Sequence, residues 1–196
     1  MTKLILILFS ALFVENFVFV KYYGLTHLLG GSTSVRTSFG IGLSVMGVTT
    51  VSGAILWPLY RFLLIPFDLL DFTTPVFLFI ICFLVQILEM LLQKYRPALF
   101  AAMGIYLPLI GVNSAIIASL RTAFSDFSFD FSRFFSCIGY CLGASLGFAF
   151  ALLLFTGVRK RIQEEDVPQS FRGIPLLLVS AGLVAIAFYA FSIIKF

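Results

Sequence analysis

Long apolar segments, separated by short polar joints, fill most of the sequence. Six of these segments are about 20 residues long, which is enough to cross the hydrocarbon core of a bilayer. They lie at roughly 4–22, 37–60, 72–93, 99–119, 132–156 and 173–194. Because lipid offers no hydrogen bonds to a bare backbone, the spanning elements are expected to be α-helices. The pattern therefore predicts an all-α integral membrane protein with six transmembrane helices.

Composition agrees with this prediction. Hydrophobic residues make up 61% of the 196-residue chain and charged residues 11%, which leaves too little polar surface to cover a soluble globule. The joints are too short to hold a linker, so residues 1–196 are expected to form one membrane domain. The formal net charge of +4 is spread over segment ends rather than gathered in a patch, which disfavours nucleic-acid binding.

Basic residues near segment ends predict the orientation. Eight of them fall on one side of the six-span arrangement and five on the other, so the side with eight is expected to be cytoplasmic. Both termini then lie on the outer side of a bacterial-type inner membrane. The eight are Lys21, Arg36, Lys94, Arg96, Arg159, Lys160, Arg161 and Arg172, and the five are Lys3, Arg61, Arg121, Arg133 and Lys195.

Three spans followed by three spans suggest an inverted repeat, with halves at about 1–94 and 95–196. The first and fourth spans both carry polar residues and glycine inside apolar sequence. These interruptions are Glu15-Asn16 with Lys21 and Gly24 to His27 in the first, and Pro108, Gly111 and Asn113-Ser114 in the fourth. Matching interruptions predict broken helices that meet near the middle of the membrane. A kinked helix packed against its neighbours is the alternative.

Three charged residues are candidates for an ion pathway, because burying a charge in lipid is costly. Glu15 lies deep in the first span and has Lys21 as a possible partner. Glu89 lies about one turn from the basic end of the third span. It could equally pair with Lys94 or lie in the headgroup zone.

Other motifs favour structural roles. Gly139, Gly143 and Gly147 repeat every four residues and predict a smooth helix face for close packing. Cys137 and Cys141 share one helix face and are expected to be buried free thiols. His27 is the only histidine and makes no metal site alone. The chain holds no complete catalytic site of its own, and no metal site is expected from these residues.

Several stretches, spread from the first span to the last, resemble the paired six-helix subunits shared by the Rnf electron-transport complex and the sodium-pumping NADH:quinone reductase. Lys21 and Phe171-Arg172-Gly173 look more like the Rnf A subunit, while Glu15 and Gln86 to Glu89 look equally like the reductase E subunit. The matching stretches are Glu15-Asn16-Phe17-Val18, Gly24-Leu25, Thr37 to Gly42, Val85 to Met90, Gly104 to Ile110, Asn113, Asp166-Val167-Pro168, Phe171-Arg172-Gly173 and Ala181-Gly182-Leu183.

The resemblance implies a membrane subunit of an ion-translocating electron-transport complex, paired with a homologous subunit of opposite orientation. It also implies broken first and fourth helices that each supply one cysteine, so that two paired subunits share a [2Fe-2S] cluster. Coupling would be to sodium or proton movement.

This sequence departs from the family at the cluster. Thr26 and Ser114 stand at the two ligand positions where the family has cysteine, and a neutral hydroxyl is a poor ligand for iron. No cofactor is therefore expected from this chain. The alternative function is a small non-redox ion or solute transporter or channel built on the same scaffold.

Overall fold

The computed structural model describes residues 16–127, 134–163 and 168–192, and all regular elements within these ranges are helical. The longer helices are α3 (Val35–Leu59), α4 (Thr73–Tyr95), α6 (Ser114–Phe127), α7 (Phe134–Gln163) and α8 (Ile174–Ser192). Two helices have seven residues each, α2 (Leu25–Gly31) and α5 (Pro97–Met103). The remaining elements are a π-helical segment, η2 (Tyr60–Leu64), and short 3-10 turns, η3 (Leu70–Phe72), η4 (Gly104–Tyr106), η5 (Pro108–Val112) and η7 (Gln169–Phe171).

The membrane character predicted from the sequence is confirmed. Among the described residues, three helices are long and apolar enough to cross a bilayer, namely Val35–Leu64, Leu70–Tyr95 and Phe134–Ile162. Two shorter apolar helices cover Pro97–Tyr106 and Ile174–Ala190. The long helices coincide with the second, third and fifth predicted spans, and the last of the shorter ones coincides with the sixth. The total of six spans stays a prediction, because most of the first span lies outside the described residues.

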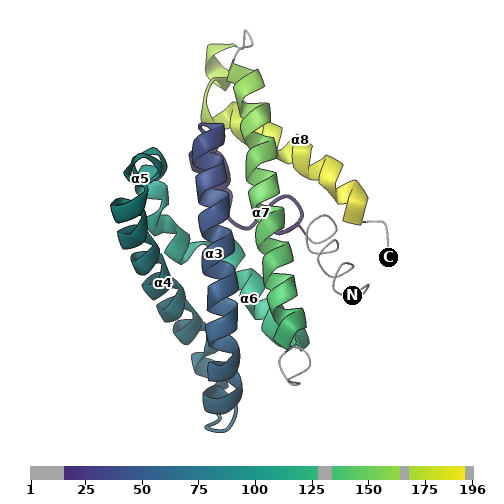
Figure 1. Cartoon of the computed structure of the whole chain (residues 1–196). Coiled ribbons are helices and arrows are strands. Elements are labelled where there is room, and N and C mark those ends of the chain that lie inside the picture. The colour runs from purple at the N-terminus through teal and green to yellow at the C-terminus, as the bar shows by residue number, and fades with distance from the viewer. Residues whose placement is uncertain (1–15, 128–133, 164–167, 193–196) are drawn as a thin grey trace.

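Helices α3 and α7 run side by side along the centre of the molecule (Figure 1). Their contact is close because small residues line it: a Cβ added at Gly42 would lie only 2.7 Å from the Cβ of Ala149. The hydroxyls of Ser38 and Thr156 are 2.6 Å apart across the same contact. Helices α4 and α5 cover one flank of α3, and α8 leads away from the C-terminal end of α7 (Figure 1).

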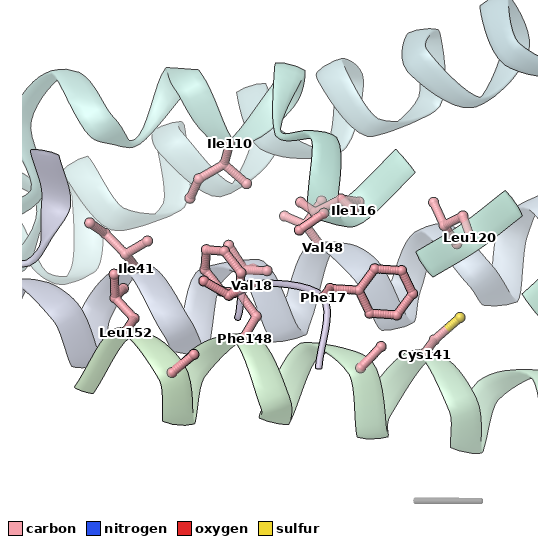
Figure 2. Close-up of a cluster of buried hydrophobic side chains, with 14 of the residues drawn as sticks. Phe17, Val18, Ile41, Val48, Ile110, Ile116, Leu120, Cys141, Phe148 and Leu152 are labelled. Atoms are coloured by element: carbon pink, nitrogen blue, oxygen red, sulfur yellow. The ribbon is translucent and has the colours of Figure 1, made fainter. Parts of the chain in front are cut away.

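The hydrophobic core between the long helices is filled by the segment that follows residue 16. Figure 2 shows Phe17 and Val18 beside the α7 residues Phe148 and Cys141, with Ile110 and Ile116 from the fourth predicted span close by. Phe17, Val18, Ile110 and Ile116 are all fully buried. The two segments that the sequence predicts to be broken therefore meet in the core.

Both of these segments extend further than the sequence predicted. The fourth runs from α5 through η4 and η5 into α6 and ends at Phe127, rather than at residue 119. The first was predicted to end at residue 22, but the chain instead turns there and continues as α2 to Gly31. The sequence prediction ended the first span at its polar break, and it ended the fourth at residue 119 because Arg121 was read as a charge at a segment end.

This correction changes the orientation count. Lys21 lies at a break inside the first segment, before α2, so it does not mark a segment end. Arg121 likewise lies inside α6 and not at its end. Removing both leaves seven basic residues against four (8 − 1 = 7 and 5 − 1 = 4), which keeps the bias toward the same side.

Candidate functional site: two helix breaks that meet

The first break is built around the buried side chain of Asn16. Its Oδ1 accepts hydrogen bonds from the backbone N–H groups of Val18 at 2.9 Å and Phe19 at 3.1 Å. Its Nδ2 donates to the carbonyl oxygen of Gly147 on α7 at 3.2 Å. One amide side chain thus satisfies two backbone donors that a helix would have satisfied and fixes the turn against α7.

The turn then reverses through two residues with positive φ, Tyr22 at 57° and Gly24 at 75°. Only glycine fits at the second position, because an added Cβ would lie 2.6 Å from a ring atom of Phe148 and 3.0 Å from Oδ1 of Asn113. Gly24 is thus required both for its backbone conformation and for the close approach of the second break.

The second break lies between η5 and α6. Asn113 is extended, with ψ at 116°, and its Oδ1 accepts from the N–H of Ala115 at 2.9 Å, which caps the start of α6. The two breaks therefore use the same device: a buried asparagine whose side-chain oxygen binds the N–H two residues further along the chain.

The breaks are joined by one direct hydrogen bond. The backbone N–H of Gly24 donates to Oγ of Ser114 at 2.9 Å, across 90 positions of sequence. Gly24 is buried, so this hydroxyl satisfies a donor that has no access to water. Thr26, the other position to which the resemblance assigns a ligand, is exposed on α2 and has no side-chain hydrogen bond within the described part of the chain.

The meeting point lies between the two ends of the long helices. Helix α2 ends beside the basic end of α7, where Nη1 of Arg159 donates to the carbonyl oxygen of Leu29 at 2.6 Å. Helix α6 leads the other way, because its Phe124 packs on Tyr60 at the far end of α3. At 1.5 Å per residue, α2 and α6 rise about 10 Å and about 21 Å from the breaks, which together equal roughly one hydrocarbon thickness.

Two buried polar atoms beside the breaks lack a hydrogen-bond partner among the described residues: Nδ1 of His27 and Nδ2 of Asn113. The other ring nitrogen of His27, Nε2, lies 3.1 Å from the carbonyl oxygen of Tyr106, which the η4–η5 turns leave free. The imidazole therefore ties α2 to η4, the turn that precedes η5 and the second break. His27 is 1% exposed, so it belongs to the interior of the break region.

A half-open cavity of about 420 Å³ opens beside the breaks, between the first-break turn and α6. Its polar lining comes from Lys21 and Tyr23 on the turn and from Ser114, Arg121 and Thr122 on α6. Lys21 and Arg121, which the orientation count placed on opposite sides, thus line one cavity. Nζ of Lys21 also lies 4.7 Å from the ring centroid of Phe17.

The donor set does not fit an iron–sulfur cluster. Such clusters need thiolates, whereas Ser114 offers a hydroxyl already engaged by Gly24 and Thr26 offers an exposed hydroxyl. Cys137 and Cys141 are free and fully buried on α7, and Cys141 faces Gly53 of α3. Among the described residues no group of three or more His, Cys, Asp or Glu side chains could hold a metal ion.

The candidate ion-pathway residues fall in different places. Glu15 lies outside the described residues, next to Asn16. Lys21 lies at the first break and lines the cavity. Glu89 is half-buried on α4, away from the cavity, and no ion pair joins it to Lys94 in the described ranges. The structure thus brings Lys21 to the candidate site and leaves Glu89 outside it.

The glycine ridge, made of Gly139, Gly143 and Gly147, lies along the side of α7 that the first break contacts. Gly143 and Gly147 are buried and Gly139 is half-buried. Asn16 reaches the ridge through its hydrogen bond to the carbonyl oxygen of Gly147. Close packing of the whole ridge against another helix stays a prediction.

Some residues of this site could be predicted from the sequence and others could not. Asn16 and Asn113 stood inside the interruptions, and their type is typical of chain turns. Arg121 was counted only as a charge at a segment end, although its distance from Phe127 places it inside α6. The signal that the sequence analysis missed was the distance between Arg121 and the end of α6.

Comparison with known proteins places the chain in a family. Residues 4–195 match the family described as "Rnf-Nqr subunit, membrane protein", and the chain belongs to it. It is 39% identical over 193 residues to the A subunit of the Na⁺-translocating ferredoxin:NAD⁺ oxidoreductase complex of Acetobacterium woodii, covering 98% of each chain. It is 35% identical to the corresponding subunit of the proton-translocating complex of Clostridium ljungdahlii, over 98% of this chain and 97% of that one. The A subunit of the ion-translocating oxidoreductase complex of Serratia proteamaculans is 34% identical, and the match covers 100% of both chains.

Proposed function

We propose that this chain is the A-type membrane subunit of an Rnf-type ion-translocating oxidoreductase complex, in which it scaffolds the membrane arm without ligating a cluster. The family match and the relatives, which are similar from end to end, support this place in the complex. The family includes subunits of the quinone-reductase type, but these three relatives are all A subunits of ferredoxin:NAD⁺ or ion-translocating oxidoreductase complexes.

The proposed architecture is six spans in two inverted halves, with the breaks of the first and fourth spans meeting inside the membrane. The shared asparagine device and the Gly24–Ser114 hydrogen bond support this arrangement. Breaks are tolerated at such depth only where side chains or other segments satisfy the freed backbone groups. The partner that this scaffold would take is a homologous subunit inserted with the opposite orientation.

The proposed orientation has both termini on the outer side, supported by the bias of seven basic residues against four. Reporter fusions at Phe196 and after Arg161 test it. A signal of cytoplasmic location from the fusion at Phe196 contradicts the orientation, and the same signal from the fusion after Arg161 supports it.

We further propose that Thr26 and Ser114 occupy the ligand positions of the family and no longer serve a cluster. The hydrogen bond from Gly24 is the observation that carries this proposal, because it gives Ser114 a structural task that does not need metal. No equivalent structural task falls to Thr26, since it is exposed and its side chain has no hydrogen bond to the described residues.

Purification of the tagged full chain from membranes tests whether it belongs to such a complex. Recovery of a homologous membrane subunit together with flavin- and iron–sulfur-carrying subunits is the expected result. Recovery of the chain alone, combined with ion or solute uptake into liposomes that contain only this chain, would instead support the non-redox transporter.

A further inference from the structure

Arg121 stands in an unusual place for an arginine. It lies seven residues after Ser114 on α6, so it is about 10 Å along the helix from the breaks, and six residues before the end of the helix at Phe127. In the proposed six-span arrangement its backbone therefore lies within the membrane, about two turns from the end of α6. A guanidinium in this position needs an anionic or strongly polar partner, or must reach the headgroup region through its long side chain.

The described part of the chain does not supply that partner. Among the described residues, Arg121 forms no ion pair and no carboxylate lines the 420 Å³ cavity to which it belongs. Asp71 lines a separate cavity of about 440 Å³ on the other side of Arg121, again without forming an ion pair with it in the described ranges. Arg121 is exposed toward both cavities, so its charge is open to a ligand.

The lining of the first cavity has two chemically different parts. Lys21 and Arg121 carry positive charge, and the hydroxyls of Ser114 and Thr122 add hydrogen-bond donors. Phe17, Ile117 and Ala118 make the remaining wall apolar. Two cations with hydroxyl donors suit a phosphate group, and an apolar wall beside them suits an acyl chain.

We propose that the cavity between the first-break turn and α6 binds an anionic phospholipid, with its phosphate at Arg121 and Lys21 and an acyl chain along Ile117 and Ala118. The cavity volume lies in the range of small-molecule sites and exceeds what a phosphate alone would fill. The bound lipid would fill the surface between the turn and α6 and so support the breaks. This inference rests on the position of α6 in the membrane and does not depend on the redox role.

The test is the lipid that stays bound to the full chain after purification. The chain, with any subunits that accompany it, is reconstituted in nanodiscs that contain phosphatidylglycerol and phosphatidylcholine in equal amounts. It is then extracted into mild detergent, and retained lipids are counted by native mass spectrometry. The variants are Arg121→Gln and Lys21→Gln. The matched control is Arg161→Gln, an exposed basic residue at the end of α7 that does not line the cavity.

Retention of phosphatidylglycerol should fall roughly fivefold in Arg121→Gln and by a smaller factor in Lys21→Gln, and it should be unchanged in Arg161→Gln. Each variant removes one basic side chain, but in the proposed complex only Arg121 and Lys21 contact the lipid headgroup. Equal retention of both lipids in the wild type, or equal loss in all three variants, contradicts the proposal. Displacement of the lipid by millimolar inorganic phosphate would show that the free ion is the ligand. Unchanged lipid but loss of a co-purifying subunit in Arg121→Gln would show that a carboxylate of a partner protein occupies the cavity, and either result overturns the lipid assignment.

Discussion

Ser114 accepts the backbone N–H of Gly24 at 2.9 Å and so fastens the start of α6 to the turn before α2. The bond joins two segments that are both interrupted among buried apolar residues. An unpaired backbone donor is costly in such surroundings. The Ser114 hydroxyl therefore keeps the two breaks in contact by pairing the N–H of Gly24.

Removal of the Ser114 hydroxyl and removal of the Thr26 hydroxyl, at the two proposed ligand positions, should have different effects on stability. Ser114→Ala leaves the buried Gly24 N–H without an acceptor and should lower the free energy of unfolding by about 1–3 kcal/mol. Thr26→Ala removes an exposed hydroxyl without a partner among the described residues and should change the free energy of unfolding little. Thermal unfolding of the purified chain in detergent measures both. Equal losses in the two variants would show that Ser114 has no special structural task.

The amide of Asn16 should be among the most sensitive polar groups of the fold. Asn16→Ala removes the acceptor for Val18 and Phe19 and the donor to Gly147, and should cost on the order of 3 kcal/mol. The control is Gln93→Ala, an exposed amide on α4. Detergent-resistant folding, followed by chromatography and thermal melts, is the readout. A stable Asn16→Ala variant would mean that water satisfies the turn and that the break is wet.

Replacing glycine by alanine should affect stability differently at the first break and within a regular helix. Gly24→Ala forces a side chain into positive φ and into the ring of Phe148, so it should lower stability by about 2 kcal/mol or more and reduce membrane yield. Gly47→Ala adds a methyl group in open space within α3 and should be neutral or stabilising by up to about 1 kcal/mol. Equal stability and equal membrane yield of Gly24→Ala and Gly47→Ala would contradict the close approach of the two breaks.

The glycine ridge of α7 offers a test of helix packing. Gly143→Leu places a large side chain at a buried position and should disturb assembly with the partner subunit. Gly157→Leu is the matched control on the same helix, because a Cβ there meets nothing within 4 Å. Chromatographic size and recovery of co-purifying subunits are compared. Normal assembly of Gly143→Leu would show that the ridge faces lipid.

Much of this site could be predicted from the sequence, because the two breaks are marked by local residue patterns. The interruptions at Asn16 and at Asn113-Ser114 stand out because polar residues are rare inside apolar spans. The segment ends were less visible. The prediction stopped the first span at residue 22 because a break and an end carry the same residue types, whereas only packing shows that α2 continues to Gly31. The Gly24–Ser114 hydrogen bond and the sharing of one cavity by Lys21 and Arg121 depend on tertiary contacts across about 100 positions, which no local pattern encodes.

The most direct test of the account is iron and acid-labile sulfide in the anaerobically purified complex, measured with the electron paramagnetic resonance of the reduced sample. Each measurement compares the wild-type chain with Thr26→Cys/Ser114→Cys and with Cys137→Ser/Cys141→Ser. We expect no cluster attributable to this chain in the wild type, because two hydroxyls cannot supply the thiolates that such a cluster needs. We expect additional iron and sulfide in Thr26→Cys/Ser114→Cys, because thiols then stand at the two proposed ligand positions, and no change in the α7 variant. Stoichiometric iron in the wild type that disappears in Thr26→Ala/Ser114→Ala would contradict the account, and iron that disappears only in Cys137→Ser/Cys141→Ser would show that the α7 thiols have taken over the cluster.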